Sequence, residues 1–271
     1  MGFGLGCLRR PDRLRENWAM DLGLAGSAFL VTAASEGLGY ATARALVAEG
    51  AGVLLVARRP DRLQSAVESL GDDRRAYGLS ADLADPDTAD RAVRAAQRAF
   101  GRLDGALISV GGPPPGQTLE LTDRQWRAGF ESVFLAALRV IRGVLAVNPA
   151  ARLGLVLSSS ARSPLPRMAI SNGLRPGLAM LVKQLADEIG PAGGRVFGLL
   201  PGFIATRRLI ELDATRTDPQ AYRAAAEATI PLRRYGLPDE FGRLAAFLLS
   251  DAASYLTGSL IPVDGGFGRA L

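Results

Sequence analysis

The chain has 271 residues, 48% of them hydrophobic, which is enough to bury one large core. It contains no histidine and one cysteine, Cys7, which excludes histidine-dependent catalysis, metal sites built on histidine or clustered cysteines, and an intrachain disulfide. Its formal charge is +5, but the basic residues are scattered among acidic ones and form no stripe, so we predict no nucleic-acid partner.

Residues 1–19 differ in composition from the rest of the chain, with several glycines and arginines and no apolar stretch long enough for a secretory signal. Arginine enrichment is typical of transit peptides, but Asp12 and Glu16 argue against one. We expect a disordered extension, a folded unit over residues 20–271 and a cytoplasmic location. No run of about eighteen apolar residues occurs, so no contact with a membrane is predicted.

The first element of the folded unit is a strand over residues 28–31, because this apolar run is too short for a helix and carries β-formers. A glycine-bearing turn over residues 32–39 and an amphipathic helix over residues 40–49 come next. A strand, turn and helix in this order predict the start of a βαβ unit.

The turn itself predicts an anion site. Gly37 and Gly39 stand where the chain must turn tightly and where a ligand can approach bare backbone. A helix beginning near Leu38 points its unpaired N–H groups and its positive dipole end at the same place. In a βαβ unit the usual anion is a dinucleotide pyrophosphate, although Ala33 stands where a third glycine would, and a plain connection is the alternative.

Strand and helix patterns then alternate without a linker or repeat. The predicted strands are 53–57, 76–80, 105–110, 152–158, 195–200 and 260–263, and the predicted helices are 61–70, 86–100, 123–147, 170–189 and 239–249. Alternating units with buried strands predict an α/β fold, a Rossmann-type doubly wound parallel sheet of about seven strands with helices on both faces. Ligands of such sheets bind where the carboxyl ends of the strands meet.

The end of the second predicted strand bears on cofactor choice. An acid there would accept hydrogen bonds from a ribose 2′-hydroxyl, whereas an arginine would pair with a 2′-phosphate. The sequence has Arg58 and Arg59, with no acid before Asp61. We predict NADP(H), held by Arg58 with help from Arg59; a plain surface arginine pair is the alternative.

Residues 20–271 resemble the short-chain dehydrogenases/reductases of the single-domain type. The resemblance is carried by residues 32–39, Asp82-Leu83, Gly111, residues 201–206 and residues 256–266, in that order. It implies that Asp82 contacts the adenine amino group with Leu83 packed nearby, and that Ile204 and Thr206 hold the nicotinamide carboxamide. Asp82 can also simply cap a turn. The candidate cofactor residues are Thr32, Ala34, Ser35, Gly37, Leu38, Gly39, Arg58, Arg59, Asp82, Leu83, Gly111, Pro201, Gly202, Ile204 and Thr206.

The active site departs from the family pattern. Members carry a serine, a tyrosine thirteen positions later, a lysine four after that, and an asparagine in the long fourth helix. Counted from Ser158, the tyrosine place is Ser171 and the lysine place is Arg175, and the asparagine place is Val133. Of the four residues only the serine is present.

A register with a gap would place Met168 and Asn172 at the tyrosine and lysine positions, and neither is more reactive. We prefer the ungapped register because Lys183 then falls where the family often has a basic residue.

The remaining side chains suit part of the chemistry of carbonyl reduction. The hydroxyls of Ser158 and Ser171 can stabilise a developing oxyanion, and Arg175 can place a permanent charge nearby. Neither serine nor arginine ionises readily enough to donate the proton. Water relayed through Ser171, or an acidic group of the substrate, is then the expected source. Losing a positioned acid lowers the rate by roughly 10²–10⁴-fold, which leaves room for catalysis.

The segment of about 207–230 is expected to cover the substrate, as the resemblance implies. Tyr222 in this segment could replace the missing acid, but packing is the favoured role, and Glu211 and Asp213 are expected to be solvated. The proline-rich stretch 111–116 is either a rigid wall of the substrate pocket, which we slightly favour, or a stiff loop.

Two functions remain open. The first is an NADP(H)-dependent oxidoreductase acting on a small-molecule carbonyl or alcohol, with no metal and a non-standard proton route. The second is a catalytically silent NADP-binding scaffold, sensor or partner subunit. Polar residues at positions 171 and 175 favour the enzyme. The resemblance also implies a homodimer or homotetramer joined through the two long helices and the C-terminal segment.

Overall fold

The computed structural model describes residues 21–71 and 74–270, and the predicted extension over residues 1–19 lies outside them. Its core is a parallel sheet in the order β3-β2-β1-β4-β5-β6-β7. The strands are β1 (Ala28–Thr32), β2 (Gly52–Ala57), β3 (Ala76–Ser80), β4 (Gly105–Ile108), β5 (Arg152–Val156), β6 (Arg195–Pro201) and β7 (Ser259–Val263). The predicted doubly wound sheet of about seven strands is therefore confirmed.

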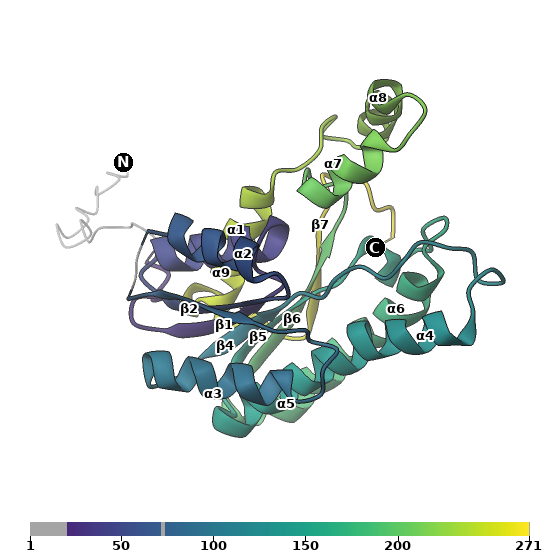
Figure 1. Ribbon diagram of the computed structural model, residues 1–271. Helices are drawn as coiled ribbons and strands as arrows, with labels where there is room; N and C mark the ends of the chain where they lie inside the picture. The colour runs from purple at the N-terminus through teal and green to yellow at the C-terminus, as the bar shows by residue number, and fades with distance from the viewer. Residues whose placement is uncertain (1–20, 72–73, 271) are drawn as a thin grey trace, which may run out of the picture.

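Helices cover both faces of this sheet (Figure 1). The α-helices are α1 (Gly37–Ala48), α2 (Pro60–Ser69), α3 (Thr88–Phe100), α4 (Asp123–Gly129), α5 (Ala136–Val147), α6 (Ala169–Ile189), α7 (Arg207–Ala214), α8 (Pro219–Thr229) and α9 (Pro238–Leu249). Short helical segments are η1 (Phe130–Leu135), η2 (Ser159–Ala161), η3 (Gly190–Ala192) and η4 (Asp251–Ala253). In Figure 1, α1, α2 and α9 lie above the sheet and α3, α5 and α6 below it.

Burial on both faces explains the continuous apolar strands. In β1, Phe29 and Val31 join the core cluster beneath α1 and α9, whereas Leu30 joins the cluster on the opposite face with α3, α5 and α6. All five residues of β1 are buried, because successive side chains of a strand point to opposite faces and helices cover both.

The predicted continuous helix over residues 123–147 is wrong in one detail: η1, a π-helical segment, separates α4 from α5. Val133 in this segment is fully buried, and the preceding Gly129 packs closely on α6, since an added Cβ would lie 2.5 Å from Ile170 Cγ2. Tertiary packing thus determines the local helix type here, and π-segments are common near functional sites.

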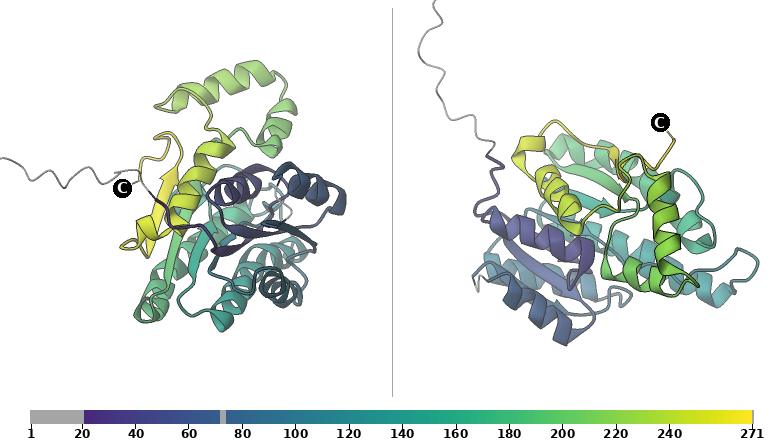
Figure 2. Two further views of the ribbon diagram at one scale, coloured as in Figure 1. Left: turned by 90° about the vertical axis from the view of Figure 1, so that its left-hand side faces the viewer. Right: turned by 90° about the horizontal axis from the view of Figure 1, so that it is seen from above.

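The segment over residues 207–230 forms two capped helices. The Thr206 side chain accepts a hydrogen bond from the Leu209 N–H at the start of α7, and the Asp218 side chain accepts one from the Ala221 N–H at the start of α8. Figure 2 shows α7 and α8 standing apart from the two helical layers. Across residues 21–71 and 74–270, no helix has the length and apolarity needed to cross a bilayer.

Candidate active site

The strand order reverses between β1 and β4, and a side-chain clamp joins their carboxyl ends. The Thr32 hydroxyl donates to the Ser109 carbonyl (2.5 Å) and accepts from the Ser109 N–H (2.8 Å). Thr32 and Ala34 have no exposed surface. These two predicted cofactor residues therefore support the turn from beneath, whereas the ligand crevice of such sheets lies above this reversal point.

The glycine turn has the geometry that the sequence predicts. Gly37 has φ of +62°, and a Cβ on Gly39 would lie 2.7 Å from the Ala33 carbonyl oxygen and 2.9 Å from that of Thr32. Ala33 itself has φ of +50°, the conformation that a glycine would adopt more easily. Helix α1 begins at Gly37, so its free N–H groups adjoin bare backbone, with Ser35 and Leu38 half-buried beside it.

Glu36 at the start of α1 gathers three arginines, a feature that sequence reasoning missed. Its carboxylate pairs with Arg59 (3.1 Å) and Arg62 (3.1 Å) from the β2–α2 region and with Arg207 (2.7 Å) from α7. An acidic residue within a predicted anion-binding turn was the available signal. The ion pair with Arg207 connects α7 to the glycine turn. Arg59, which the sequence predicts to assist Arg58, is paired with Glu36 instead of being free for a phosphate.

Arg58 differs from its neighbours. It follows β2 directly and is exposed, and its guanidinium makes no hydrogen bond or ion pair with any residue that the structure describes. Because Arg59 and Arg62 both pair with Glu36, Arg58 is the cation at this strand end that a phosphate can reach without displacing a carboxylate.

Asp82 has the turn-capping role that the sequence left open, and its contact with adenine stays a prediction. One carboxylate oxygen of Asp82 accepts the Ala84 N–H (3.0 Å), and the Asp82 carbonyl accepts the Thr88 hydroxyl (2.7 Å), so this residue caps a turn. The side chain is exposed and its second carboxylate oxygen has no described partner. Leu83 is half-buried and packs on the core.

The segment after β6 reaches the glycine turn. Ile204 is buried and pairs with Gly236, and Gly202 packs against Asp264, where an added Cβ would come within 2.6 Å of the Asp264 Cβ. The Thr206 methyl lies 3.4 Å from the Cβ position of Gly37. Pro201 ends β6, and Gly111, on the other side of the reversal, is exposed with open space over its Cα.

Three serines form a chain at the predicted catalytic place. The Ser160 N–H donates to Ser158 Oγ (3.1 Å), and the Ser160 and Ser171 hydroxyls lie 3.0 Å apart. Ser171 is 1% exposed, so its partner is Ser160 and it does not present its hydroxyl to the surface. Ser158 is only half-buried and keeps its own hydroxyl proton free to donate. The run of serines 158–160 was the signal for Ser160.

Arg175 is buried in α6 beside the same strand end. Its Nη1 donates to the Val156 carbonyl (2.8 Å) and the Leu157 carbonyl (2.9 Å). Burial, and secondarily the charge of Arg208, lower the pKa of Arg175 to about 10. It therefore remains protonated at neutral pH and supplies charge but no proton.

The two residues of the gapped register lie at and near the start of α6. The Asn172 side chain donates to the Leu165 carbonyl (2.9 Å) and accepts the Leu165 N–H (3.0 Å), so it braces the loop before α6. Met168 lies at the start of the same helix.

No tyrosine hydroxyl of the described residues hydrogen-bonds to the serine chain or to Arg175. The Tyr222 ring lies 4.5 Å from the Arg216 guanidinium within the helical segment, in agreement with a packing role. The expectation that Asp213 is solvated is wrong. Asp213 is buried, and its carboxylate accepts a hydrogen bond from the Tyr235 hydroxyl (3.1 Å). Glu211 is exposed and pairs with Arg207 (3.4 Å).

Tyr235→Phe is expected to lower the free energy of unfolding by about 1–3 kcal/mol, because it leaves the buried Asp213 without its donor. Burial and the bond to Asp213 raise the pKa of Tyr235, so this stabilisation is present below the ordinary tyrosine pKa and is lost as pH rises above it. Denaturant unfolding at neutral pH and faster amide exchange in α7 would measure the effect. Tyr222→Phe keeps its ring contact and serves as the matched control.

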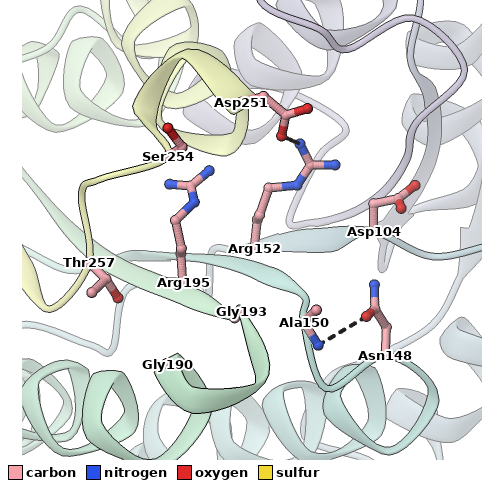
Figure 3. A pocket seen from close by; sticks show the side chains of 11 residues that line it. Asp104, Asn148, Ala150, Arg152, Gly190, Gly193, Arg195, Asp251, Ser254 and Thr257 are labelled. Carbon is pink, nitrogen blue, oxygen red and sulfur yellow. Dashed lines mark hydrogen bonds and ion pairs between the residues drawn. The ribbon is translucent and has the colours of Figure 1, made fainter.

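Two cavities lie away from the serine chain. One of about 570 Å³ lies at the amino ends of β5 and β6 (Figure 3), where Arg152 pairs with Asp251 (2.9 Å) and Arg195 donates to the carbonyls of Leu248 (3.0 Å) and Ser250 (2.7 Å). These groups satisfy one another, and ligands of such sheets bind at the opposite strand ends, so we assign this cavity no role in binding.

The second cavity, of about 510 Å³, lies beside the β6 and β7 carboxyl ends and includes Ile204 and Gly236 in its lining. It borders the predicted cofactor segment. Within the described residues no group of three histidine, cysteine, aspartate or glutamate side chains is arranged to hold a metal ion.

Comparison with known proteins agrees with this geometry. A family model described as enoyl-(acyl carrier protein) reductase matches residues 32–268. Levodione reductase from Leifsonia aquatica is 31% identical over 251 residues, covering 88% of this chain and 92% of that protein. Versicolorin reductase from Emericella nidulans is 31% identical over 267 residues, covering 93% and 97%. The crystal structure of L-sorbose reductase from Gluconobacter frateurii with NADPH and L-sorbose superposes with a TM-score of 0.87 at 31% identity, covering 93% of this chain and all of that one.

Proposed function

This chain belongs to the short-chain dehydrogenase/reductase family, and from that premise we propose that it is an NADP(H)-dependent oxidoreductase interconverting a small-molecule carbonyl and an alcohol. The observation that carries the proposal is the free Arg58 guanidinium at the end of β2, on the sheet edge that also holds the glycine turn. An unpaired arginine there matches a 2′-phosphate, and bare backbone at the start of α1 matches a pyrophosphate.

The residues present fit this cofactor. Gly37 and Gly39 keep the turn free of side chains, and Gly111 leaves open space across the reversal point. Asp82 has a free carboxylate oxygen for an adenine amino group. When bound, NADP(H) supplies or accepts the hydride.

The protein's own groups stabilise charge on the substrate oxygen. Ser158 is fixed by the Ser160 N–H and keeps its hydroxyl proton to donate to a developing oxyanion. Ser171 and Ser160 hold this arrangement from below, and Arg175 adds a fixed positive charge. Since no tyrosine is present among these groups, we propose that the proton comes from water or from an acidic group of the substrate.

A catalytically silent NADP-binding protein is the second candidate. It is favoured by the burial of Ser171, which is 1% exposed and bonded to Ser160, so that it has little surface from which to relay a proton. Polar, hydrogen-bonded side chains at the serine chain favour the enzyme.

The test is oxidation of NADPH, followed by absorbance, against a panel of activated ketones and quinones. Ser158→Ala is expected to lower kcat by about 10²–10³-fold, because one oxyanion donor is lost, while the Kd for NADPH stays unchanged. Ser163→Ala is the matched control, since this nearby serine is exposed and its hydroxyl has no described partner. Tight NADPH binding without turnover of any substrate would support the silent candidate, and absence of NADPH binding would contradict both.

We also propose a homodimer or homotetramer. Exposed apolar side chains lie on the α4–α6 side of the molecule, with Phe130 42% and Met180 69% exposed, and an interface there would bury them. The molecular mass in solution, measured by light scattering, tests this.

A further inference from the structure

Two arginines without acidic partners contact the backbone at or just beyond the carboxyl ends of the neighbouring strands β4 and β5. Arg175 comes from α6 and is buried against the last carbonyls of β5. Arg208 comes from α7 and donates to the carbonyl of Gly112 (3.3 Å), in the loop that follows β4. Their charges interact, since Arg208 contributes to the lowered pKa of Arg175. Ser158 lies at the end of the same strand that Arg175 contacts.

The position of Arg208 depends on a glycine in the facing loop. The guanidinium lies directly on Gly112, where even a methyl group would collide with it. This contact joins residues 96 positions apart in the sequence, and it is one of the links between α7 and the proline-rich loop. Arg208 is exposed, and this contact holds its guanidinium against the loop that follows β4.

Nearby acids do not neutralise this pair. Of the two acids in α7, Glu211 pairs with Arg207 and Asp213 accepts from the buried Tyr235. Glu36 is shared by three other arginines. Within residues 21–71 and 74–270, neither Arg175 nor Arg208 forms an ion pair.

Two cations without acidic partners repel each other, and the repulsion is stronger where one of them is buried. A bound anion would reverse the sign of this interaction. Guanidinium groups are also the side chains best suited to hold a carboxylate through paired, charge-assisted hydrogen bonds. Most of the other arginines around the site have an acidic partner, so the lack of one here points to a ligand.

We propose that Arg175 and Arg208 form an anion site that selects a carbonyl substrate carrying a carboxylate group. The proposal rests on the proposed function, because the site adjoins Ser158. Arg208 and Arg175 act by binding and orienting the substrate, and no covalent step is assigned to them. The pyrophosphate of the cofactor is the other anion that could reach this place, and the experiment separates the two sources.

The experiment compares keto acids with their uncharged esters. The probes are 2-oxobutanoate, 3-oxobutanoate and 4-oxopentanoate, which vary the spacing between carbonyl and carboxylate, each against its methyl ester. Binding to the protein is measured by calorimetry with and without NADP⁺, and turnover is measured with NADPH. The Kd for NADPH is measured separately by fluorescence. The variants are Arg208→Met and Arg208→Lys, and Arg216→Met removes the same charge from the same segment as a control.

We expect at least one keto acid to bind more tightly than its ester. Arg208→Met should raise the Kd of that acid by about 10–100-fold, while the Kd of the ester should change by less than about twofold. The Kd of the acid for Arg208→Lys should lie between the values for the unmodified protein and for Arg208→Met. Arg216→Met should change the Kd of neither the acid nor the ester. If Arg208 had a merely structural role, Arg208→Met would change the Kd values of acid and ester by the same factor. That result would overturn the proposal.

Three further results would also overturn it. The first is a weaker Kd for NADPH in Arg208→Met with an unchanged acid-to-ester ratio, which would assign the anion to the cofactor. The second is normal NADPH binding with no preference for any acid. The third is a protein that binds neither the acids nor NADPH. The last result would also contradict the proposed function, whereas the first two would leave it standing.

Discussion

Gly39→Ala is expected to reduce NADPH affinity by about 100-fold or more. The added Cβ would lie 2.7 Å and 2.9 Å from two backbone carbonyl oxygens, so the turn must move and its N–H groups must turn away from the ligand. Each charge-assisted hydrogen bond lost this way contributes about 1.5–3 kcal/mol. The same overpacking should lower the free energy of unfolding by about 1–3 kcal/mol. Fluorescence titration with NADPH and denaturant unfolding measure the two effects.

The matched control is Gly190→Ala. Gly190 has an ordinary helical backbone conformation, and a Cβ there would meet nothing within 4 Å. Affinity and stability should both stay at the values of the unmodified protein. If Gly39→Ala bound NADPH as well as Gly190→Ala, the glycine turn would not be the pyrophosphate site.

Arg58→Asp is the second large effect. Removing the free guanidinium should raise the Kd for NADPH by about 10–100-fold, because a charge-assisted contact with the 2′-phosphate is lost. Repulsion between the new carboxylate and the 2′-phosphate should raise this Kd further. NADH should bind equally well or better, because an acid at this position accepts hydrogen bonds from a 2′-hydroxyl. The ratio of the two Kd values is the measurement.

Arg94→Asp is the control for this charge reversal, since Arg94 is exposed on α3 and has no described partner. It should leave the ratio of Kd values unchanged. An equal loss of NADPH and NADH affinity in Arg58→Asp would show that Arg58 does not read the 2′-phosphate.

Local features of the sequence were sufficient for much of the fold. Apolar runs bounded by turns located the strands, because strands buried on both faces of a parallel sheet need no polar alternation. The requirement for glycine in the first turn was also local, since Gly37 adopts positive φ and Gly39 admits no side chain.

Other features depended on contacts between distant segments. Nothing within residues 123–147 indicates a π-helical turn, which arises where this helix packs on α6. The burial of Asp213 depends on Tyr235, 22 residues away, and the position of Arg208 depends on Gly112. No local pattern reports such pairs, because side-chain burial and ion pairing are set by which elements the fold brings together.

By itself, the sequence determined that this protein is a doubly wound sheet with a glycine turn and an arginine after the second strand. It also predicts that Ser171 and Arg175 occupy the tyrosine and lysine places of the family pattern. Those properties depend on residue type and on short-range spacing, and both can be read from the sequence directly. Only the tertiary structure decided that Ser171 bonds to Ser160, that Arg59 pairs with Glu36 while Arg58 is free, and that Arg208 contacts Gly112. Hydrogen bonds and electrostatic interactions act over a few ångströms in space, whatever the distance along the chain.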